Sequence, residues 1–137
     1  MTLGFVMLCH TALDRAAQIA RYWATRDCPV VIHVDKRSPN AAAEKLRADL
    51  ADLDNIRFSP RHACEWGTWG IVAATQEAAQ LLLRDFAQVR HVFLASGSCL
   101  PLRPVEELRA YLDARPRTDF IESVTTSDVG WTIGGLN

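Results

Sequence analysis

The stretch Val31-Ile32-His33-Val34-Asp35-Lys36-Arg37-Ser38 carries the strongest signal for the fold. It starts as an apolar run that predicts a short buried strand, and it continues into an acid, two bases and a serine. In open α/β sheets, ligands bind at the carboxyl ends of the strands. An acid there can accept hydrogen bonds from a ribose or a base, and the adjacent lysine and arginine can face phosphates. The alternative is a strand end that turns its charges into solvent.

Strands and helices alternate on both sides of this stretch. We predict five strands, over Leu3–Cys9, Val30–Val34, 55–59, 91–95 and 119–124. Four helices are predicted between them: one over 11–26, one that begins at Asn40, one over 69–86, and one that begins at Pro104. This order predicts a Rossmann-like α/β fold, with a parallel or mostly parallel sheet and helices on both faces.

Local signals place the ends and faces of these helices. Thr11 and Asn40 are residue types that cap helix N-termini. Pro104 is followed by two glutamates, which suit the positive end of the helix dipole in the first turn. The apolar face expected for the third helix consists of Val72, Ala79, Leu83 and Phe86.

Composition limits the possible functions. The 137 residues, 49% of them hydrophobic, amount to one domain with enough apolar mass for a core. Fifteen basic and 16 acidic residues give a net charge of −1, which provides no general attraction to nucleic acid or to an anionic membrane. We find no apolar run long enough for a transmembrane helix and no signal peptide. The expected location is therefore cytoplasmic, or peripheral to a membrane in a full-length protein.

The four cysteines do not form a recognisable site. Cys9, Cys28, Cys64 and Cys99 are far apart and include no Cys-x-x-Cys pair, which argues against a structural zinc site. Without an export signal, a disulfide framework is also not expected. We predict reduced, mostly buried thiols.

Several common nucleotide and hydrolase sites are excluded by their missing motifs. No glycine-rich turn follows the first strand, and the chain has no Walker sequence. The run Ser96-Gly97-Ser98 does not match a nucleophile elbow. No Asp-x-Asp pair follows the fourth strand, where many sugar-nucleotide transferases hold a divalent cation. Phosphate binding would therefore depend on basic side chains.

Candidate functional residues follow the predicted strands. They are His10, Asp35, Trp66, the run 96–99, and Glu122 at the end of the fifth strand. Each also has a purely structural interpretation, as a polar plug, a turn, a core side chain or an exposed strand end. Their convergence on the ligand-binding edge of the sheet favours a site.

At these positions the chain resembles the core-2/I-branching β-1,6-N-acetylglucosaminyltransferases and the related peptide O-xylosyltransferases. The resemblance covers nearly the whole chain, in family order. Its segments are 6–10 (VMLCH), 32–38 (IHVDKRS), 66–67 (WG), 93–102 (FLASGSCLPL) and 120–123 (FIES). It implies a GT-A-like fold and an inverting, metal-independent glycosyltransferase that takes UDP-GlcNAc or a related UDP-sugar, with a glycan hydroxyl as acceptor and no cofactor.

The resemblance also assigns roles to individual residues. It implies that the uridine diphosphate is bound by Leu8, Cys9, His10, Asp35, Cys64, Glu65 and Trp66. Trp66 would lie over the uracil, since an aromatic ring covers the flat face of a base well. Glu122 matches an acid that contacts the acceptor.

Two departures from the family pattern matter. Cys99 occupies a position where the family usually has an aspartate, so this chain lacks that carboxylate. The family's catalytic base and its phosphate-neutralising basic residues lie beyond Asn137. Residues 1–137 are therefore expected to be the nucleotide-binding N-terminal part of a longer enzyme. They are expected to self-associate through exposed apolar surface.

Two alternatives remain open. One is a non-catalytic module that keeps a nucleotide-sugar fold for recognition. The other is a flavodoxin-like or receiver-like regulatory domain, although the receiver interpretation needs an acidic cluster that Cys9 and His10 do not supply.

Overall fold

A computed structural model describes residues 2–125, 128 and 130 of the chain. Their elements are β1 (Leu3–Cys9), α1 (Leu13–Ala24), β2 (Val30–Val34), α2 (Asn40–Asp49), β3 (Ile56–Phe58), α3 (Gly70–Asp85), β4 (His91–Ser96) and α4 (Val105–Asp113). The strands form one sheet in the order β3-β2-β1-β4, and every neighbouring pair is parallel. The predicted α/β fold with a parallel sheet is confirmed.

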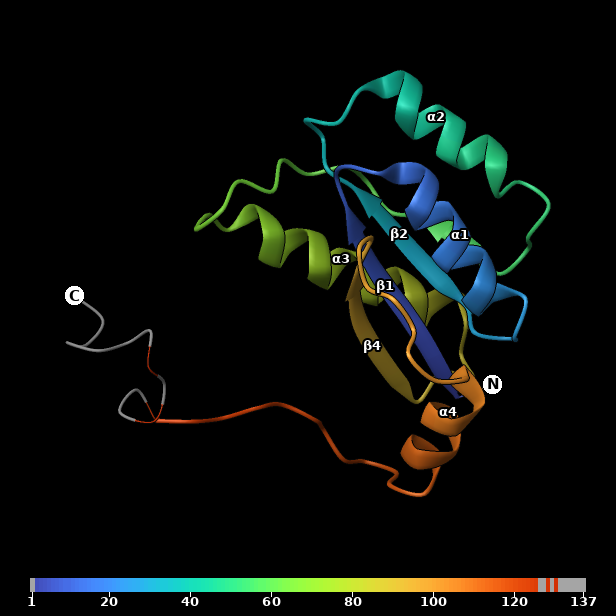
Figure 1. The fold of residues 1–137 in the computed structure, drawn as a ribbon, viewed down its shortest axis with the longest axis vertical. Helices are drawn as coiled ribbons and strands as arrows, with labels where there is room; N and C mark the ends of the chain where they lie inside the picture. Colours follow the sequence, from blue (N-terminus) through green and yellow to red (C-terminus); the bar gives the residue numbers. More distant parts are fainter. Residues whose placement is uncertain (1, 126–127, 129, 131–137) are drawn as a thin grey trace.

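The sheet carries helices on both faces (Figure 1). On one face, alternate residues of β1, beginning with Leu3 and Phe5, form a core cluster with side chains of α1, α2 and α4. On the other face, Val6 and Val31 pack against α3 through Leu82. Successive strand residues point to opposite faces, so nearly every residue of β1 and β2 is buried.

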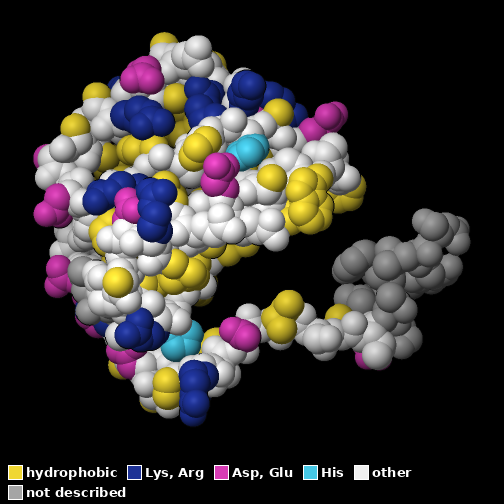
Figure 2. Space-filling view, turned by 180° about the vertical axis from the view of Figure 1, so that it is seen from behind, with side chains coloured by type: hydrophobic (Ala, Val, Ile, Leu, Met, Phe, Trp, Pro, Cys, Tyr) yellow, Lys and Arg dark blue, Asp and Glu magenta, His cyan; other side chains and the backbone are white. Residues whose placement is uncertain are grey.

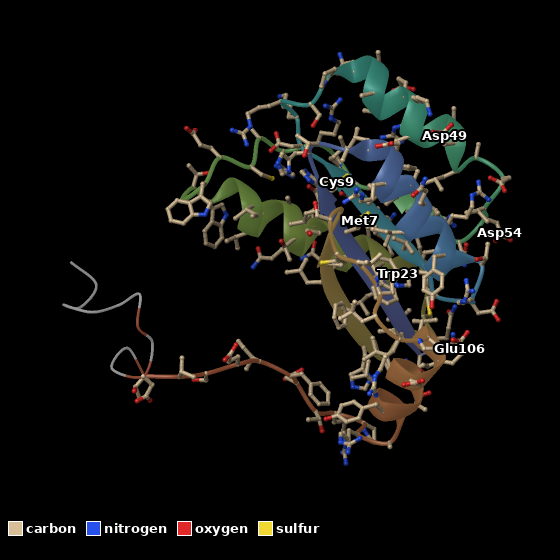
Figure 3. All side chains as sticks on the ribbon, in the orientation of Figure 1. Met7, Cys9, Trp23, Asp49, Asp54 and Glu106 are labelled. Carbon is tan, nitrogen blue, oxygen red and sulfur yellow. The ribbon has the colours of Figure 1, made fainter. Side chains whose placement is uncertain are left out.

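The larger cluster is centred on an aromatic pair. The rings of Phe5 in β1 and Trp23 in α1 are stacked with their centroids 3.9 Å apart. Figure 3 shows Trp23 directed from α1 toward the sheet, and Cys9 close to the end of β1 that borders the candidate site. This packing anchors α1 against β1, which sets the position of the loop between them.

The first two helices begin differently from the prediction. At α1, the N-cap residue is Ala12, in the left-handed region with φ 48°, and Thr11 makes no capping bond. At α2, Pro39 is the N-cap residue and Asn40 lies inside the first turn. The Asn40 side chain instead accepts a hydrogen bond from Arg61. The Asn40 side chain therefore bonds to Arg61, which is distant in sequence, and does not cap the helix.

Helix α3 matches the predicted apolar face only in part: Phe86 is buried and Ala79 packs against the core, but the centre of the helix buries a neighbouring stripe. Its buried residues are Ala74, Ala78 and Leu82, while Leu83 is 49% exposed. The helix has apolar residues around most of its circumference, so the sequence does not distinguish the two stripes. The observed stripe uses the space left by Gly4 of β1, where a Cβ atom would lie 2.9 Å from Leu82 Cδ2.

The predicted fifth strand over 119–124 is not formed. Phe120 packs on His91 and Tyr111, but the residues after it have no sheet partner and run away from the body (Figure 1). Helix α4 packs on the same face as α1, so a parallel strand placed outside β4 directly after α4 would need a left-handed crossover.

Strand β4 is consequently the edge of the described sheet. It pairs with β1 alone among the described residues, and Val92, Phe93 and Leu94 are exposed. Figure 2 shows hydrophobic side chains on the surface that borders the hollow between the body and the segment after α4. Within the described residues, no helix is long and apolar enough to span a membrane.

Candidate functional site

A pocket of about 560 Å³ opens at the carboxyl ends of β1, β2 and β4, the edge where ligands bind in open α/β sheets. The loop over 61–70, whose last residue is the first of α3, forms its remaining wall together with Ile71 of that helix. The residues around it are Leu8, Cys9, His10, His33, Asp35, Arg37, Cys64, Trp66, Ile71, Leu94, Ala95 and Ser96.

The structure brings together most of the residues that the sequence predicts for a nucleotide site. Six of the seven line this pocket: Leu8, Cys9, His10, Asp35, Cys64 and Trp66. Glu65 is exposed on the same loop but does not line the pocket. Glu122, predicted to contact the acceptor, lies in the exposed segment after α4 and is not part of it.

The Asp35 carboxylate accepts four hydrogen bonds from the chain. Its Oδ1 accepts hydrogen bonds from the backbone N of Arg37 at 2.8 Å and from Arg37 Nε at 3.1 Å. Its Oδ2 accepts from Arg37 Nη2 at 2.9 Å and from the backbone N of Cys64 at 3.3 Å. The hydrogen bond from the Arg37 side chain is the main cause that lowers the pKa of Asp35 from 3.8 to about 2. The buried carboxylate is therefore ionised at neutral pH.

Arg37 connects the strand end to the loop before α3. Besides Asp35, its Nη2 donates to the backbone oxygen of Cys64 at 2.9 Å. The side chain of Asp35 is only 5% exposed, whereas that of Arg37 is 57% exposed. The exposed part of this ion pair therefore belongs mainly to the Arg37 side chain.

Arg61 is a structural residue of the site that sequence reasoning missed. Its guanidinium donates to the backbone oxygens of Asp35 at 2.9 Å and of Ser38 at 2.6 Å, and to Asn40 Oδ1 at 2.9 Å. It thereby holds the turn that follows β2. Main-chain carbonyls carry no sequence pattern, so no local signal could have identified this role.

His33 and His62 connect the end of β2 to α3. His33 is fully buried, and its Nε2 accepts a hydrogen bond from the backbone N of His62 at 2.8 Å. Burial lowers the pKa of His33, so the ring is held neutral with its proton on Nδ1. The ring of His62 stacks on it and bonds to Glu77 of α3. These contacts fix the start of the 61–70 loop.

Trp66 stands at the tip of that loop. Its side chain is 96% exposed, and the following Gly67 adopts φ 77°, a conformation that disfavours other residues. Thr68 closes the turn by bonding back to the oxygen of Glu65. Trp69 is also exposed, at 69%, but does not line the pocket. An indole held in solvent beside a pocket is available to stack on a flat ligand.

The thiols of the site are unpaired. All four cysteines are free, and two of them, Cys9 and Cys28, are buried. Burial raises the pKa of Cys9 to about 12, so it packs as a neutral side chain. Cys64 is half-buried, while Cys99 is exposed and does not line the pocket, although it bonds to Ser96, which does. The prediction of mostly buried thiols therefore holds for Cys9 and Cys28 but not for Cys99.

Comparison with known proteins places the chain. No curated protein matches it by sequence. The sequence model of one family, described as Core-2/I-Branching enzyme, matches residues 3–133. That family has a GT-A-like fold, with which the parallel sheet is consistent, and it indicates a glycosyltransferase. The chain therefore belongs to the Core-2/I-branching enzyme family.

Proposed function

We propose that the pocket at the carboxyl ends of β1, β2 and β4 binds the uridine diphosphate of a UDP-sugar, UDP-GlcNAc or a related donor. The chain would be the nucleotide-binding half of an inverting, metal-independent glycosyltransferase. The observation that carries this proposal is the convergence of Leu8, His10, Asp35 and Trp66 on one pocket in a chain of this family.

The chemistry of the pocket walls supports a nucleoside. Leu8, Ile71 and Leu94 give an apolar lining, and the exposed indole of Trp66 can cover one face of a base. A few polar side chains complete the lining, among them His10, Asp35, Arg37 and Ser96. An apolar slot with a few fixed polar groups is typical of small-molecule sites.

The proposed reaction is a single displacement. A carboxylate takes the proton of an acceptor hydroxyl, whose oxygen attacks the anomeric carbon of the sugar. The bond from that carbon to the diphosphate breaks, and cationic side chains stabilise the departing UDP. The base is expected from residues beyond Asn137.

One observation favours the second candidate, a non-catalytic nucleotide-sugar-binding module. Of the described residues that line the pocket, Asp35 is the only carboxylate, and its oxygens are occupied by Arg37 and Cys64. It is therefore not placed to act as a base. Transfer assays with a longer form of the protein separate the two candidates.

Isothermal titration with UDP tests the site. The wild-type chain should bind, and Asp35→Ala and Trp66→Ala should bind markedly more weakly. Arg21→Met is a matched control, because Arg21 forms a similar two-pronged pair with Asp52 away from the pocket. Unchanged UDP affinity in both site variants would reject the assignment.

A further inference from the structure

The outer edge of β4 carries backbone groups that the sheet does not use. In a strand, the N–H and C=O of one residue point to the same side, and successive residues alternate between the two sides. The odd-numbered His91 and Gly97 both donate their backbone N–H to the β1 side, each at 2.9 Å. Val92 and Leu94 therefore direct their N–H and C=O away from β1, and no partner for these groups lies within the described residues.

The free part of this edge is short, because the turn after β4 closes it. Ser96 is the next residue that faces outward, but both of its backbone groups are occupied by Cys99. The N–H of Ser96 donates to Cys99 Sγ at 3.3 Å, and its carbonyl oxygen accepts from the backbone N of Cys99 at 3.1 Å. The free edge in the described part of β4 is therefore limited to one donor and one acceptor each from Val92 and Leu94.

An edge of this kind is complementary to itself. When a second copy is related to the first by a two-fold axis that passes beside Phe93, perpendicular to the sheet, the two β4 strands run antiparallel. Val92 of each copy then lies opposite Leu94 of the other, and the two residues exchange both of their N–H···O bonds. This register satisfies every outward-facing group of both free edges. A shift along the strand would leave some of them unpaired or place them opposite Ser96, whose groups are already used.

The side chains along this edge are apolar and exposed on both faces of the sheet. Val92 is 39% exposed, Phe93 41% and Leu94 53%. Helix α3 packs on β1 and β2, so it does not cover the Val92 and Leu94 side chains. On the opposite face, the ring of Phe93 packs on Phe5, with their centroids 5.6 Å apart, and Phe5 in turn stacks on Trp23.

The two-fold register brings the Phe93 side chains of both copies together. They lie directly opposite each other in a non-hydrogen-bonded pair, the position where facing side chains of antiparallel strands are closest. Aromatic pairs at such positions stabilise strand pairing. The row of rings formed by Trp23, Phe5 and Phe93 would thus continue from one copy into the other.

Further apolar surface borders the edge, as a stable interface requires. Such interfaces bury at least about 1,200 Å² in total, more than one short strand edge supplies. Leu100, Leu102 and Tyr111 are exposed, and Phe120 packs on His91 at the start of β4. In the antiparallel arrangement, the start of one β4 meets the end of the other, so Phe120 of one copy comes close to the turn that carries Leu100 of the second. The hollow beside the body in Figure 2 leaves this side accessible.

We propose that the chain forms a two-fold dimer in which the β4 edges of two copies pair antiparallel, centred on Phe93, and join two four-stranded sheets into one. The interface is isologous, because the same residues contribute from both sides. The proposal is independent of the ligand that binds the pocket. Its alternative is that the 121–124 segment of one copy pairs with β4 of the other.

Sedimentation equilibrium of the 137-residue chain tests the dimer. It should show monomer and dimer without larger species, since a two-fold interface is closed. Val92→Pro removes the outward N–H and leaves the bonds to β1 in place, as proline on an edge strand can do. Each dimer then loses two hydrogen bonds, so its Kd should rise about 5- to 150-fold. Val92→Thr is the matched control. It keeps the N–H and the branched shape, and the Kd should change less than about threefold.

A second substitution covers the case in which the proline variant does not fold. Val92→Lys keeps the backbone and adds a charge at a half-exposed position, a device by which edge strands avoid pairing. It should also shift the equilibrium to monomer. Thermal unfolding of each variant verifies that the monomer is folded.

Cysteine cross-linking tests the register. In a Cys99→Ser background, where serine keeps an acceptor for the Ser96 N–H, Phe93→Cys should form an intermolecular disulfide on oxidation. The facing Cβ atoms of a non-hydrogen-bonded pair lie within reach of a disulfide. Val92→Cys should not cross-link, because the two copies of position 92 are diagonal neighbours about 7–8 Å apart. Peptide mass spectrometry identifies the linked residues.

The remaining outcomes separate the β4 pairing from other arrangements. Replacing 121–124 by glycine and serine should leave the dimer and the Phe93→Cys cross-link intact, and loss of both would show that this segment is exchanged instead. A dimer that survives Val92→Pro and Val92→Lys in folded form, or that cross-links through Val92→Cys and not Phe93→Cys, overturns the proposal. So does a chain that stays monomeric at every concentration, and none of these results bears on UDP binding.

Discussion

Replacing Trp66 by alanine should weaken UDP binding without destabilising the fold. The indole is 96% exposed, so its removal takes almost no apolar surface out of the core. The free energy of unfolding should therefore change by less than about 0.5 kcal/mol, as for other exposed positions. Any loss of UDP affinity must then come from the bound state.

The expected loss of UDP affinity follows from the stacking of the base on the Trp66 indole. Stacking of a base on an aromatic side chain contributes about 1–3 kcal/mol, which corresponds to a fall in affinity of about 5- to 150-fold. Trp66→Phe keeps a flat ring and should retain most of the affinity. Uridine should show the same fractional loss as UDP, because the ring contacts the base and not the phosphates.

Titration calorimetry with UDP and uridine measures these changes. Trp69→Ala is the matched control, since Trp69 is exposed on the same loop but lies outside the pocket. Equal affinities in wild type and Trp66→Ala would refute the stacking argument. An equal loss in Trp69→Ala would show that the loop as a whole matters, not the indole at position 66.

Four other outcomes are expected. UDP affinity should stay nearly unchanged when EDTA is added, and a requirement for manganese would contradict the proposed metal independence. Because Arg37 holds the pKa of Asp35 at about 2, against 3.8 ordinarily, the ionised carboxylate should stabilise the fold by about 2 kcal/mol. This contribution to the free energy of unfolding is complete above about pH 5 and is lost as the pH falls through 2. The free energy of unfolding of Asp35→Asn, measured against pH, should therefore lack this loss. Residues 1–137 alone should show background glycosyl transfer with several UDP-sugars and acceptors, and they should sediment as a dimer or larger species because Phe93 and Leu94 are exposed. Robust turnover would instead require Glu65 or Glu122 as the base, and a monomer would contradict self-association.

The strands whose bounds the sequence predicted best are those buried on both faces of the sheet. β1 and β2 have the predicted bounds, because a strand buried on both faces is a continuous apolar run with polar residues at its end. The position of Asp35 at the ligand-binding edge follows from the same pattern. The pocket could be anticipated because parallel strands bring their carboxyl ends together.

Features that depend on distant partners could not be predicted in this way. Asn40 has the composition of a cap, yet Arg61 takes its side chain. The 119–124 segment has the composition of a strand, yet α4 lies on the face that makes an outward crossover left-handed. In each case a local preference of about 1 kcal/mol does not decide the outcome, because tertiary contacts and chain topology also contribute.

The sequence by itself determined the order of strands and helices and the edge of the sheet where a ligand would bind, because hydrophobic periodicity is a local property. Only the tertiary structure decided which groups meet at that edge. Arg37 closes over Asp35, Arg61 holds the carbonyls of the following turn, and Trp66 stands free in solvent. The physical reason is that hydrogen-bond geometry and exposure are set by atoms that the fold brings together from three separate strand ends and a loop.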